Sequence, residues 1–213
     1  MNTQHEKYIV TTFTGNEGTK KFRNIAKMHK EVIDTGFLSS FSVFILSQLY
    51  LSIARSRFSS LCVCTDTAGQ IIGFIAISFS TSSFYKEFIL RKGVLLSPFL
   101  IGRVFSIEFL KKLSETLLYP FKSSSVESNY EKIDSEILNF CVAKEIQGMG
   151  IGQSLFNKGE EEFRNNSISN IQIVTGGQQK SAHRFYEKCG AKLIASLEIH
   201  KNAESLIYNY KIF

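Results

Sequence analysis

Apolar residues recur along this chain with two spacings, and each spacing predicts a different kind of element. Residues 60–65 and 71–79 are rich in Val, Ile and Phe and flank the polar turn Asp66–Gly69, which predicts a β-hairpin. Apolar side chains three and four positions apart predict helices over 18–34 and from about 41 to 55. Two helices are therefore expected before the hairpin.

The rest of the chain alternates strand-like and helix-like runs. Helices are predicted at 150–164 and 181–189, and Gly190 stands where a helix commonly ends in a left-handed residue. Strands are predicted at 7–12, 136–142, 171–175, 192–200 and 205–213. This order indicates an α/β fold, an α+β mixed sheet with helices on both faces, in a single domain spanning 1–213. It contains a long insert at about 81–131, where apolar residues follow helical spacing at Ile107, Leu110, Leu113 and Leu117.

The composition is that of a folded globular protein. Of the 213 residues, 44% are hydrophobic and 21% are charged, so a sizeable core can form. Residues 36–54 carry no charge over a length that could cross a bilayer, but their serines and helical apolar spacing predict a helix packed on a soluble core. The first seven residues are polar and do not resemble a signal peptide, so a cytoplasmic location is expected.

The cysteines and the net charge indicate which metals and ligands the protein could bind. The cysteines lack zinc-site spacing, so no metal is predicted and buried free thiols are expected at Cys62, Cys64, Cys141 and Cys189. The formal net charge is +6, and residues 84–122 alone hold an excess of four positive charges. A basic surface favours anionic small molecules or a peripheral membrane contact through the insert, whereas a solvated face explains the same charges equally well.

The glycine-rich segment from Val142 to Gly152 carries the main chemical signal. It follows a predicted strand and opens a predicted helix, so unpaired N–H groups and the positive end of the helix dipole make an anion site. A Walker loop would require Lys and Ser or Thr after Gly152, and Gln153 follows instead. A dinucleotide fingerprint would require different glycine spacing and a carboxylate after the next strand, which ends in Gly176.

The pattern Val-x4-Gln-x2-Gly-x-Gly over 142–152 resembles the acetyl-CoA pyrophosphate loop of the GNAT (Gcn5-related N-acetyltransferase) superfamily. The segment 179–190 is similar to that family's second signature, N-x2-A-x2-F-Y-E-x2-G-F, and the element order also matches. Gln179 replaces the usual Asn of this signature, and Ala191 replaces the usual Phe. An ordinary glycine-rich turn would explain the first motif alone, but not the two motifs in order.

The resemblance implies a set of cofactor-binding residues. Main-chain N–H groups would hold the pyrophosphate of acetyl-CoA at Gln147, Gly148, Met149, Gly150, Ile151, Gly152 and Gln153. The pantetheine arm would pair with the edge of the fourth strand at Phe140, Cys141 and Val142, and would lie beside Gln179 and Ala182. Arg184 would reach the 3′-phosphate, although an exposed helical arginine is the simpler explanation.

Two residues are candidates for catalysis. Tyr186 matches the family tyrosine near the thioester sulfur and would act as general acid, unless it is only a core aromatic. Glu136 is the candidate general base, because even spacing along a strand predicts one shared face for Glu136, Leu138, Phe140 and Val142 and a raised carboxylate pKa. A water chain is the alternative base, and weaker candidates on the first helix are His29, Glu31 and Asp34.

The predicted activity is acetyl transfer from acetyl-CoA to a primary amine by direct attack in a ternary complex. Cys141 lies inside a strand without a histidine partner in view, which disfavours an acyl-cysteine route. The segment 36–40 and the insert resemble a bacterial subgroup associated with cell-surface polysaccharide loci, which implies an amino-sugar nucleotide as acceptor. The alternatives are a protein N-terminus or lysine as acceptor, or a non-catalytic acyl-CoA-binding module; nucleic-acid binding would leave both motifs unexplained.

Overall fold

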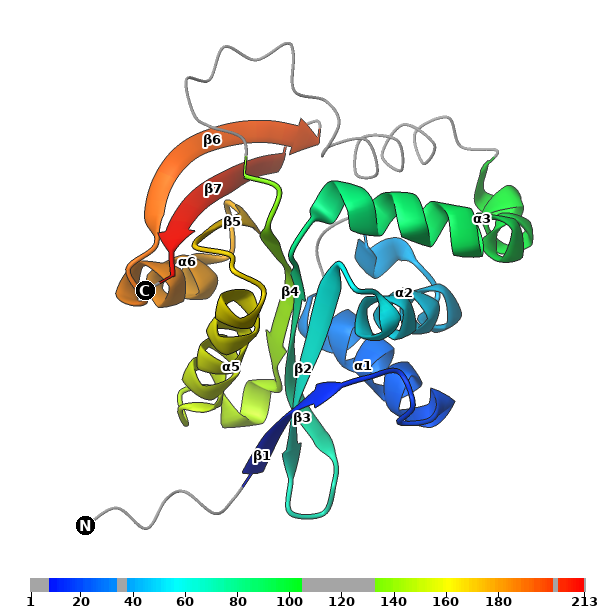
Figure 1. Ribbon diagram of the computed structural model, residues 1–213, viewed down its shortest axis with the longest axis horizontal. Helices are drawn as coiled ribbons and strands as arrows, with labels where there is room; N and C mark the ends of the chain where they lie inside the picture. Colours follow the sequence, from blue (N-terminus) through cyan, green and yellow to red (C-terminus); the bar gives the residue numbers. More distant parts are fainter. Residues whose placement is uncertain (1–7, 34–37, 105–132, 201–202, 213) are drawn as a thin grey trace.

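A seven-stranded mixed sheet forms the centre of the computed structural model, which describes residues 8–33, 38–104, 133–200 and 203–212 (Figure 1). Its strands are β1 (Tyr8–Phe13), β2 (Ser59–Asp66), β3 (Ile71–Ser78), β4 (Glu136–Val142), β5 (Asn170–Gly176), β6 (Lys192–His200) and β7 (Ala203–Lys211). Their order across the sheet is β1-β2-β3-β4-β5-β7-β6. Neighbours are antiparallel except β4 and β5, which are parallel. The predicted mixed sheet is confirmed.

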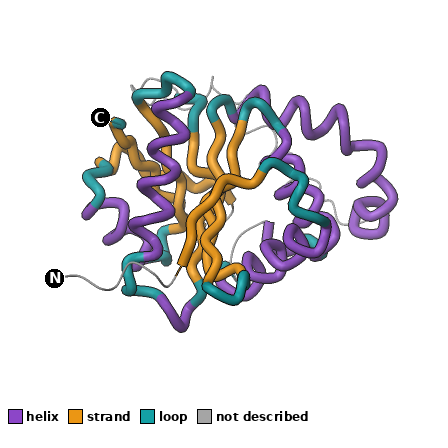
Figure 2. The backbone as a smooth tube through the Cα atoms, turned by 60° about the horizontal axis from the view of Figure 1, so that its bottom comes forward, coloured by secondary structure: helices purple, strands orange, loops and turns teal. Residues whose placement is uncertain are grey.

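Helices cover both faces of this sheet (Figures 1 and 2). One face carries α1 (Thr19–Val32), α2 (Val43–Arg55) and α3 (Thr81–Val104), and the other carries α5 (Ile151–Asn165) and α6 (Lys180–Lys188). Two short 3₁₀ turns, η1 (Leu38–Ser40) and η3 (Lys144–Ile146), precede α2 and α5. The predicted helices are present, and α3 accounts for the first part of the insert. The helical spacing predicted at 107–117 lies outside the described residues.

Local chemistry explains where several helices begin and end. The Ser42 hydroxyl accepts the N–H of Ile45 at 3.3 Å and caps α2, so this helix begins two residues later than its apolar pattern suggests. Gly190, two residues after the end of α6, has φ +95°. It therefore has a positive φ at the end of this helix, as predicted. Helix α1 buries the stripe Phe22, Ile25 and Ala26 against the sheet.

Two apolar layers fill the space on either side of the sheet. Under α1 and α2, Tyr50, Phe74 and Phe84 are almost fully buried. Under α5, Phe156 and Phe163 pack with Ile75 and Ile137. Residues 43–55 thus form a helix packed on a core, as predicted, and within the described ranges no helix has both the length and the apolar character to cross a membrane.

The predicted state of the cysteines also holds. Cys62, Cys64 and Cys141 are buried free thiols, and Cys189 is a half-buried one. Burial raises the pKa of Cys62 to about 11, which makes this thiol unreactive near neutral pH. Among the described residues no group of histidine, cysteine or acidic side chains is arranged to hold a metal ion.

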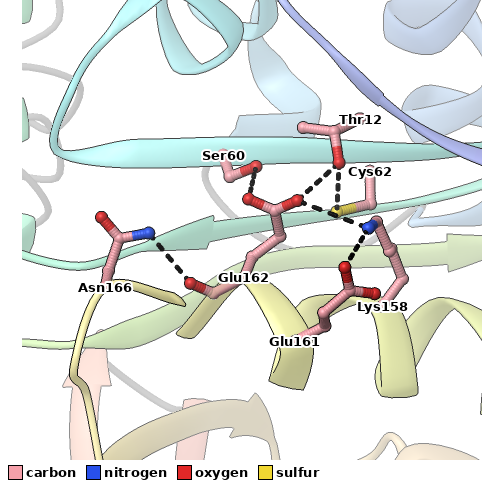
Figure 3. A network of polar contacts seen from close by, with 7 residues as sticks. All are labelled: Thr12, Ser60, Cys62, Lys158, Glu161, Glu162 and Asn166. Carbon is pink, nitrogen blue, oxygen red and sulfur yellow. Dashed lines mark hydrogen bonds and ion pairs between the residues drawn. The ribbon is translucent and has the colours of Figure 1, made fainter. Parts of the chain in front are cut away.

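A polar network fastens α5 to the first two strands (Figure 3). The Glu162 carboxylate accepts the hydroxyl of Thr12 at 2.7 Å and that of Ser60 at 3.4 Å, and Lys158 lies 3.8 Å away. The Thr12 hydroxyl also lies 3.8 Å from the sulfur of Cys62. This network fixes the position of α5, whose first turn borders the glycine loop.

Candidate functional site

Strands β4 and β5 are paired only at their beginnings. Their parallel register joins Glu136 with Gln172 and Ile137 with Ile173 and then stops, although β4 continues for five more residues and β5 for three. On its other side β4 stays paired with β3 as far as Val142. The free edge of β4 from Leu138 to Val142 therefore faces an opening between the two strands.

The hydrogen bonds at the end of β4 show which main-chain groups point into this opening. The N–H of Ala143 donates to the carbonyl of Ile72 at 3.0 Å, on the β3 side. Because main-chain groups alternate along a strand, those of Phe140 and Val142 point away from β3, and those of Cys141 point toward it. The side chain of Gln147 donates to the Val142 carbonyl at 3.0 Å from that open side.

The glycine loop lies at the far end of this opening, at the start of α5. Gly148 and Gly150 have φ of +82° and +85°, and nothing lies within 4 Å of the position that a Cβ would take at either residue. Helix α5 begins with no side-chain cap and no acidic residue in its first turn. Its first N–H groups thus face open space at the positive end of the helix dipole, an arrangement suited to an anion.

A cleft of about 780 Å³ occupies the opening. The predicted cofactor residues that line it are Phe140, Val142, Gln147, Gly148, Gly152, Gln179 and Ala182. Those that do not line it are Cys141, Met149, Gly150, Ile151 and Gln153. Met149 is exposed, Ile151 is buried under α5, and the Cys141 side chain is buried under α1 and α2.

The cleft runs through the sheet from one face to the other. On the α5 side it is bordered by Gly152 and by Phe185 of α6. On the α1 side it is bordered by Val32 and Ile33, which end α1 and pack against the opposite apolar layer. Figure 1 shows β4 between these two groups of helices. A ligand held at the glycine loop can therefore meet a second ligand arriving from the α1 side.

Tyr186 lies on the wall of the cleft. The residue is 6% exposed, its ring packs beside Phe140 and Phe156, and within the described part of the chain its hydroxyl has no hydrogen-bond partner. Burial raises its pKa, and the nearby Cys141 and Cys189 thiols act in the same direction. The phenol is therefore neutral near pH 7 and carries a proton that it can donate.

Glu136 does not share a face with Phe140 and Val142, so that prediction is wrong. The register between β3 and β4 shifts, because Asn139 pairs with Ala76 and Ile137 with Ile77, which leaves Leu138 as an extra residue. This bulge reverses the alternation: Ile137 packs under α5, whereas Leu138 packs under α1 and α2. Glu136 consequently faces the α1 and α3 side.

The environment of Glu136 suits a base. Glu136 as a residue is half-buried, does not line the cleft directly, and lies at the start of β4 next to residues that do. Burial, with a smaller effect of the Asp134 carboxylate, raises its pKa to about 8. The Glu136 charge in turn raises the pKa of Tyr85 on α3, where burial is the larger cause. The predicted increase of the Glu136 pKa is thus present, on the opposite face.

Of the other site residues predicted from the sequence, Gln179 lies on the cleft wall, whereas His29, Glu31 and Arg184 do not. The Gln179 amide oxygen accepts the hydroxyl of Thr175 at 2.7 Å, which holds this side chain at the cleft wall. His29 is 1% exposed and contacts the Tyr50 hydroxyl at 2.5 Å, so it is a core residue. Glu31 and Arg184 are exposed and do not line the cleft, and Asp34 lies outside the described residues.

Several residues that line the cleft were not predicted from the sequence. Val32 and Ile33 looked like part of the buried stripe of a helix, and Asn139 looked like an interruption of an apolar strand. Thr175 gave no signal beyond its place at the end of β5. The amide of Asn139 inside an apolar run was the one usable clue, since polar side chains are costly there without a purpose.

Comparison with known proteins places this geometry in context. The model of the acetyltransferase (GNAT) family matches residues 116–191, which include β4, the glycine loop, α5, β5 and α6. No curated protein matches the chain.

Solved structures share the fold across nearly the whole chain. Ard1 from Thermoplasma volcanium has a TM-score of 0.60 at 14% identity, over 97% of this chain and 99% of that one. The ribosomal-protein-S18-alanine N-acetyltransferase from Escherichia coli has a TM-score of 0.58 at 8% identity, over 96% and 94%. The spermidine/spermine N-acetyltransferase SpeG from Vibrio cholerae has a TM-score of 0.55 at 14% identity, over 98% and 94%.

Proposed function

We propose that the chain is an acetyl-CoA-dependent N-acetyltransferase of the GNAT superfamily, whose family model matches residues 116–191, and that it acetylates a primary amine of a small molecule by direct attack in a ternary complex. The observation that carries the proposal is the cleft between β4 and β5, which has the glycine loop at one end, Tyr186 on its wall and access from both faces of the sheet. Two ligands can occupy such a cleft together.

The residues of the cleft fit acetyl-CoA. The first N–H groups of α5 and the open space at Gly148 and Gly150 suit the pyrophosphate. The outward main-chain groups of Phe140 and Val142 suit the amide-bearing pantetheine arm, as a partner strand would. The Gln179 side chain, held by Thr175, adds an amide at the same wall.

The reaction then requires one bond to form and one to break. The amine nitrogen attacks the thioester carbonyl carbon with its lone pair, a C–N bond forms, the C–S bond breaks, and the sulfur leaves with the bonding electrons. A main-chain N–H of Phe140 or Val142 stabilises the negative charge that develops on the carbonyl oxygen. Tyr186 supplies a proton to the sulfur, so the products are the amide and the free thiol.

Glu136 is the proposed base that removes a proton from the amine. Its raised pKa, about 8, is close to the operating pH, where proton transfer is most effective. Because the carboxylate lies beside the cleft rather than on its wall, one water relays the proton. A base near the α1 side also lies on the face from which the acceptor enters.

The sequence and the similar structures point to different classes of acceptor. The sequence resemblance favours an amino-sugar nucleotide, whose phosphates would need cations that the basic insert could supply outside the described residues. The names of the similar structures include enzymes acting on a protein alanine and on polyamines, at identities that show the fold alone.

The role of Tyr186 can be tested against a matched control. We expect Tyr186→Phe to lower kcat at least tenfold, because the proton donor is lost, while the Kd for CoA measured by calorimetry stays within twofold. Tyr208→Phe is the control, since Tyr208 packs beside Tyr186 but does not line the cleft. Equal losses in the two variants would remove the acid role, and the absence of any CoA binding to the unmodified protein would refute the function.

The role of Glu136 can be tested by the pH dependence of kcat/KM. The unmodified enzyme should gain activity as pH rises through about 8, because only the ionised carboxylate accepts a proton. Glu136→Gln should be slower and should lose that rise. If Glu136→Gln kept the same pH dependence of kcat/KM, the base would be another group.

A further inference from the structure

The α1 side of the cleft differs in chemistry from the α5 side. Its wall consists of Val32, Ile33 and Leu138, together with Val174 of β5, which points to this face because Ile173 points to the other. Of the described residues that line the cleft, Lys144 alone is charged, and it lies on the loop that leads to α5. The acceptor entrance is therefore apolar as far as the structure describes it.

One polar side chain interrupts this wall. Asn139 faces the α1 side, because Phe140 next to it packs under α5. The bulge at Leu138 places two consecutive side chains, Leu138 and Asn139, on the same face of β4. Within the described part of the chain the Asn139 carboxamide has no hydrogen-bond partner, although it lies half-buried in the wall. Its amide reaches the cleft, where a ligand can take the place of solvent as its hydrogen-bond partner.

We propose that Asn139, framed by Val32 and Ile33, binds the acceptor, and that the acceptor is a small alkylamine or arylalkylamine rather than a phosphate-bearing sugar, a polyamine or a peptide. The inference rests on the proposed acetyl transfer and narrows its substrate. The Asn139 oxygen accepts an N–H of the neutral amine and directs the nitrogen lone pair toward the thioester, while the hydrocarbon part of the amine covers the apolar wall. Along the described part of this wall, a second charge on the acceptor would find no side chain of opposite charge.

A thiol-release assay with acetyl-CoA tests the substrate class directly. The panel contains hexylamine, 2-phenylethylamine, spermidine, a nucleotide-linked 2-amino sugar and a short peptide with a free N-terminus. We expect the highest kcat/KM for one of the first two amines. A higher value for any of the other three would overturn the inference while leaving acetyl transfer intact.

Failure of the inference and failure of the function give different results. If the protein binds CoA by calorimetry but turns over neither apolar amine, the inference is wrong. If it neither binds CoA nor releases thiol with any member of the panel, the proposed function itself fails, and the inference with it.

Substitution of Asn139 tests the recognition step. Asn139→Leu keeps the size of the side chain and removes the hydrogen bond, so kcat/KM for the best apolar amine should fall by about tenfold, in line with one buried hydrogen bond. The Kd for CoA should stay within twofold. Asn209→Leu on β7, which does not line the cleft, is the matched control and should leave both values unchanged. An unchanged kcat/KM in Asn139→Leu, or an equal loss of CoA binding, would refute the assignment.

A second variant covers the case in which Asn139→Leu does not fold. Ile33→Asp adds a carboxylate at the end of α1 on the cleft wall. It should lower kcat/KM for hexylamine at least tenfold and raise the ratio of spermidine to hexylamine activity, since the added charge pairs with the second ammonium. An unchanged ratio would show that the acceptor does not meet this wall.

Discussion

The buried histidine on α1 makes the stability of this protein depend on pH in a defined window. His29 is 1% exposed, its Nδ1 contacts the Tyr50 hydroxyl, and its Nε2 is buried without a partner among the described residues. Burial, with a smaller effect of the Lys30 charge, lowers the pKa of His29 to about 4. In the unfolded chain the same imidazole titrates near its ordinary value of 6.5.

The direction of the effect follows from which state binds the proton. Between about pH 6.5 and pH 4 the unfolded chain is protonated at His29 and the folded chain is not, so acid favours unfolding. The stabilisation is present above pH 6.5 and is lost as pH falls toward 4. For these two pKa values the loss between pH 7 and pH 5 is about 2 kcal/mol.

Urea unfolding at pH 7 and pH 5 measures this loss against a matched variant. The double variant His29→Phe/Tyr50→Phe removes both hydrogen-bonding partners and leaves neither of them buried alone. The difference in unfolding free energy between the two proteins should change by about 2 kcal/mol from pH 7 to pH 5, because all other titrating groups are shared. A change below about 0.5 kcal/mol would mean that His29 is not kept neutral by its burial.

Further predictions concern the glycine loop and the network that holds α5. Gly150→Ala and the control Gly69→Ala, both at positive φ, should each cost about 1 kcal/mol of stability in urea unfolding, and only Gly150→Ala should weaken CoA binding in calorimetry. Equal CoA affinities would exclude the loop as the pyrophosphate site. Glu162→Gln should lower the free energy of unfolding by about 1 kcal/mol, because Thr12 loses a charged acceptor, whereas Glu161→Gln should cost less than about 0.5 kcal/mol, since Glu161 is exposed. An equal loss of unfolding free energy in the two variants would mean that the hydrogen bonds of Glu162 do not stabilise the fold.

Short-range patterns in the sequence predicted most of the elements. Strand β4 was predicted to the residue at 136–142, and α5 was displaced by one residue, because a strand followed by glycines and an amphipathic helix is a local signal. Helix α3 was not bounded by the sequence, since its apolar residues form no single stripe that would mark a buried face.

Features that depend on pairing between strands could not be read from the sequence. The separation of β4 from β5 depends on which residues of β5 pair with β7, along its whole length from Asn170 to Gly176. The bulge at Leu138 depends on the register with β3. Strict alternation along β4 therefore predicted correctly that Phe140 and Val142 share a face, and wrongly that Glu136 and Leu138 share it with them.

The corrected face of Glu136 makes the catalytic proposal more coherent. Had Glu136 shared a face with Phe140 and Val142, its carboxylate would lie on the α5 side, away from the face that Val32 and Ile33 border. The bulge turns it to the α1 side, the face on which Asn139 borders the acceptor entrance. In the proposed mechanism, acid and base then stand on opposite faces of one sheet, with Tyr186 on the α5 side and Glu136 on the α1 side. Under that proposal, the single extra residue in β4 separates the group that would protonate the sulfur from the group that would deprotonate the amine.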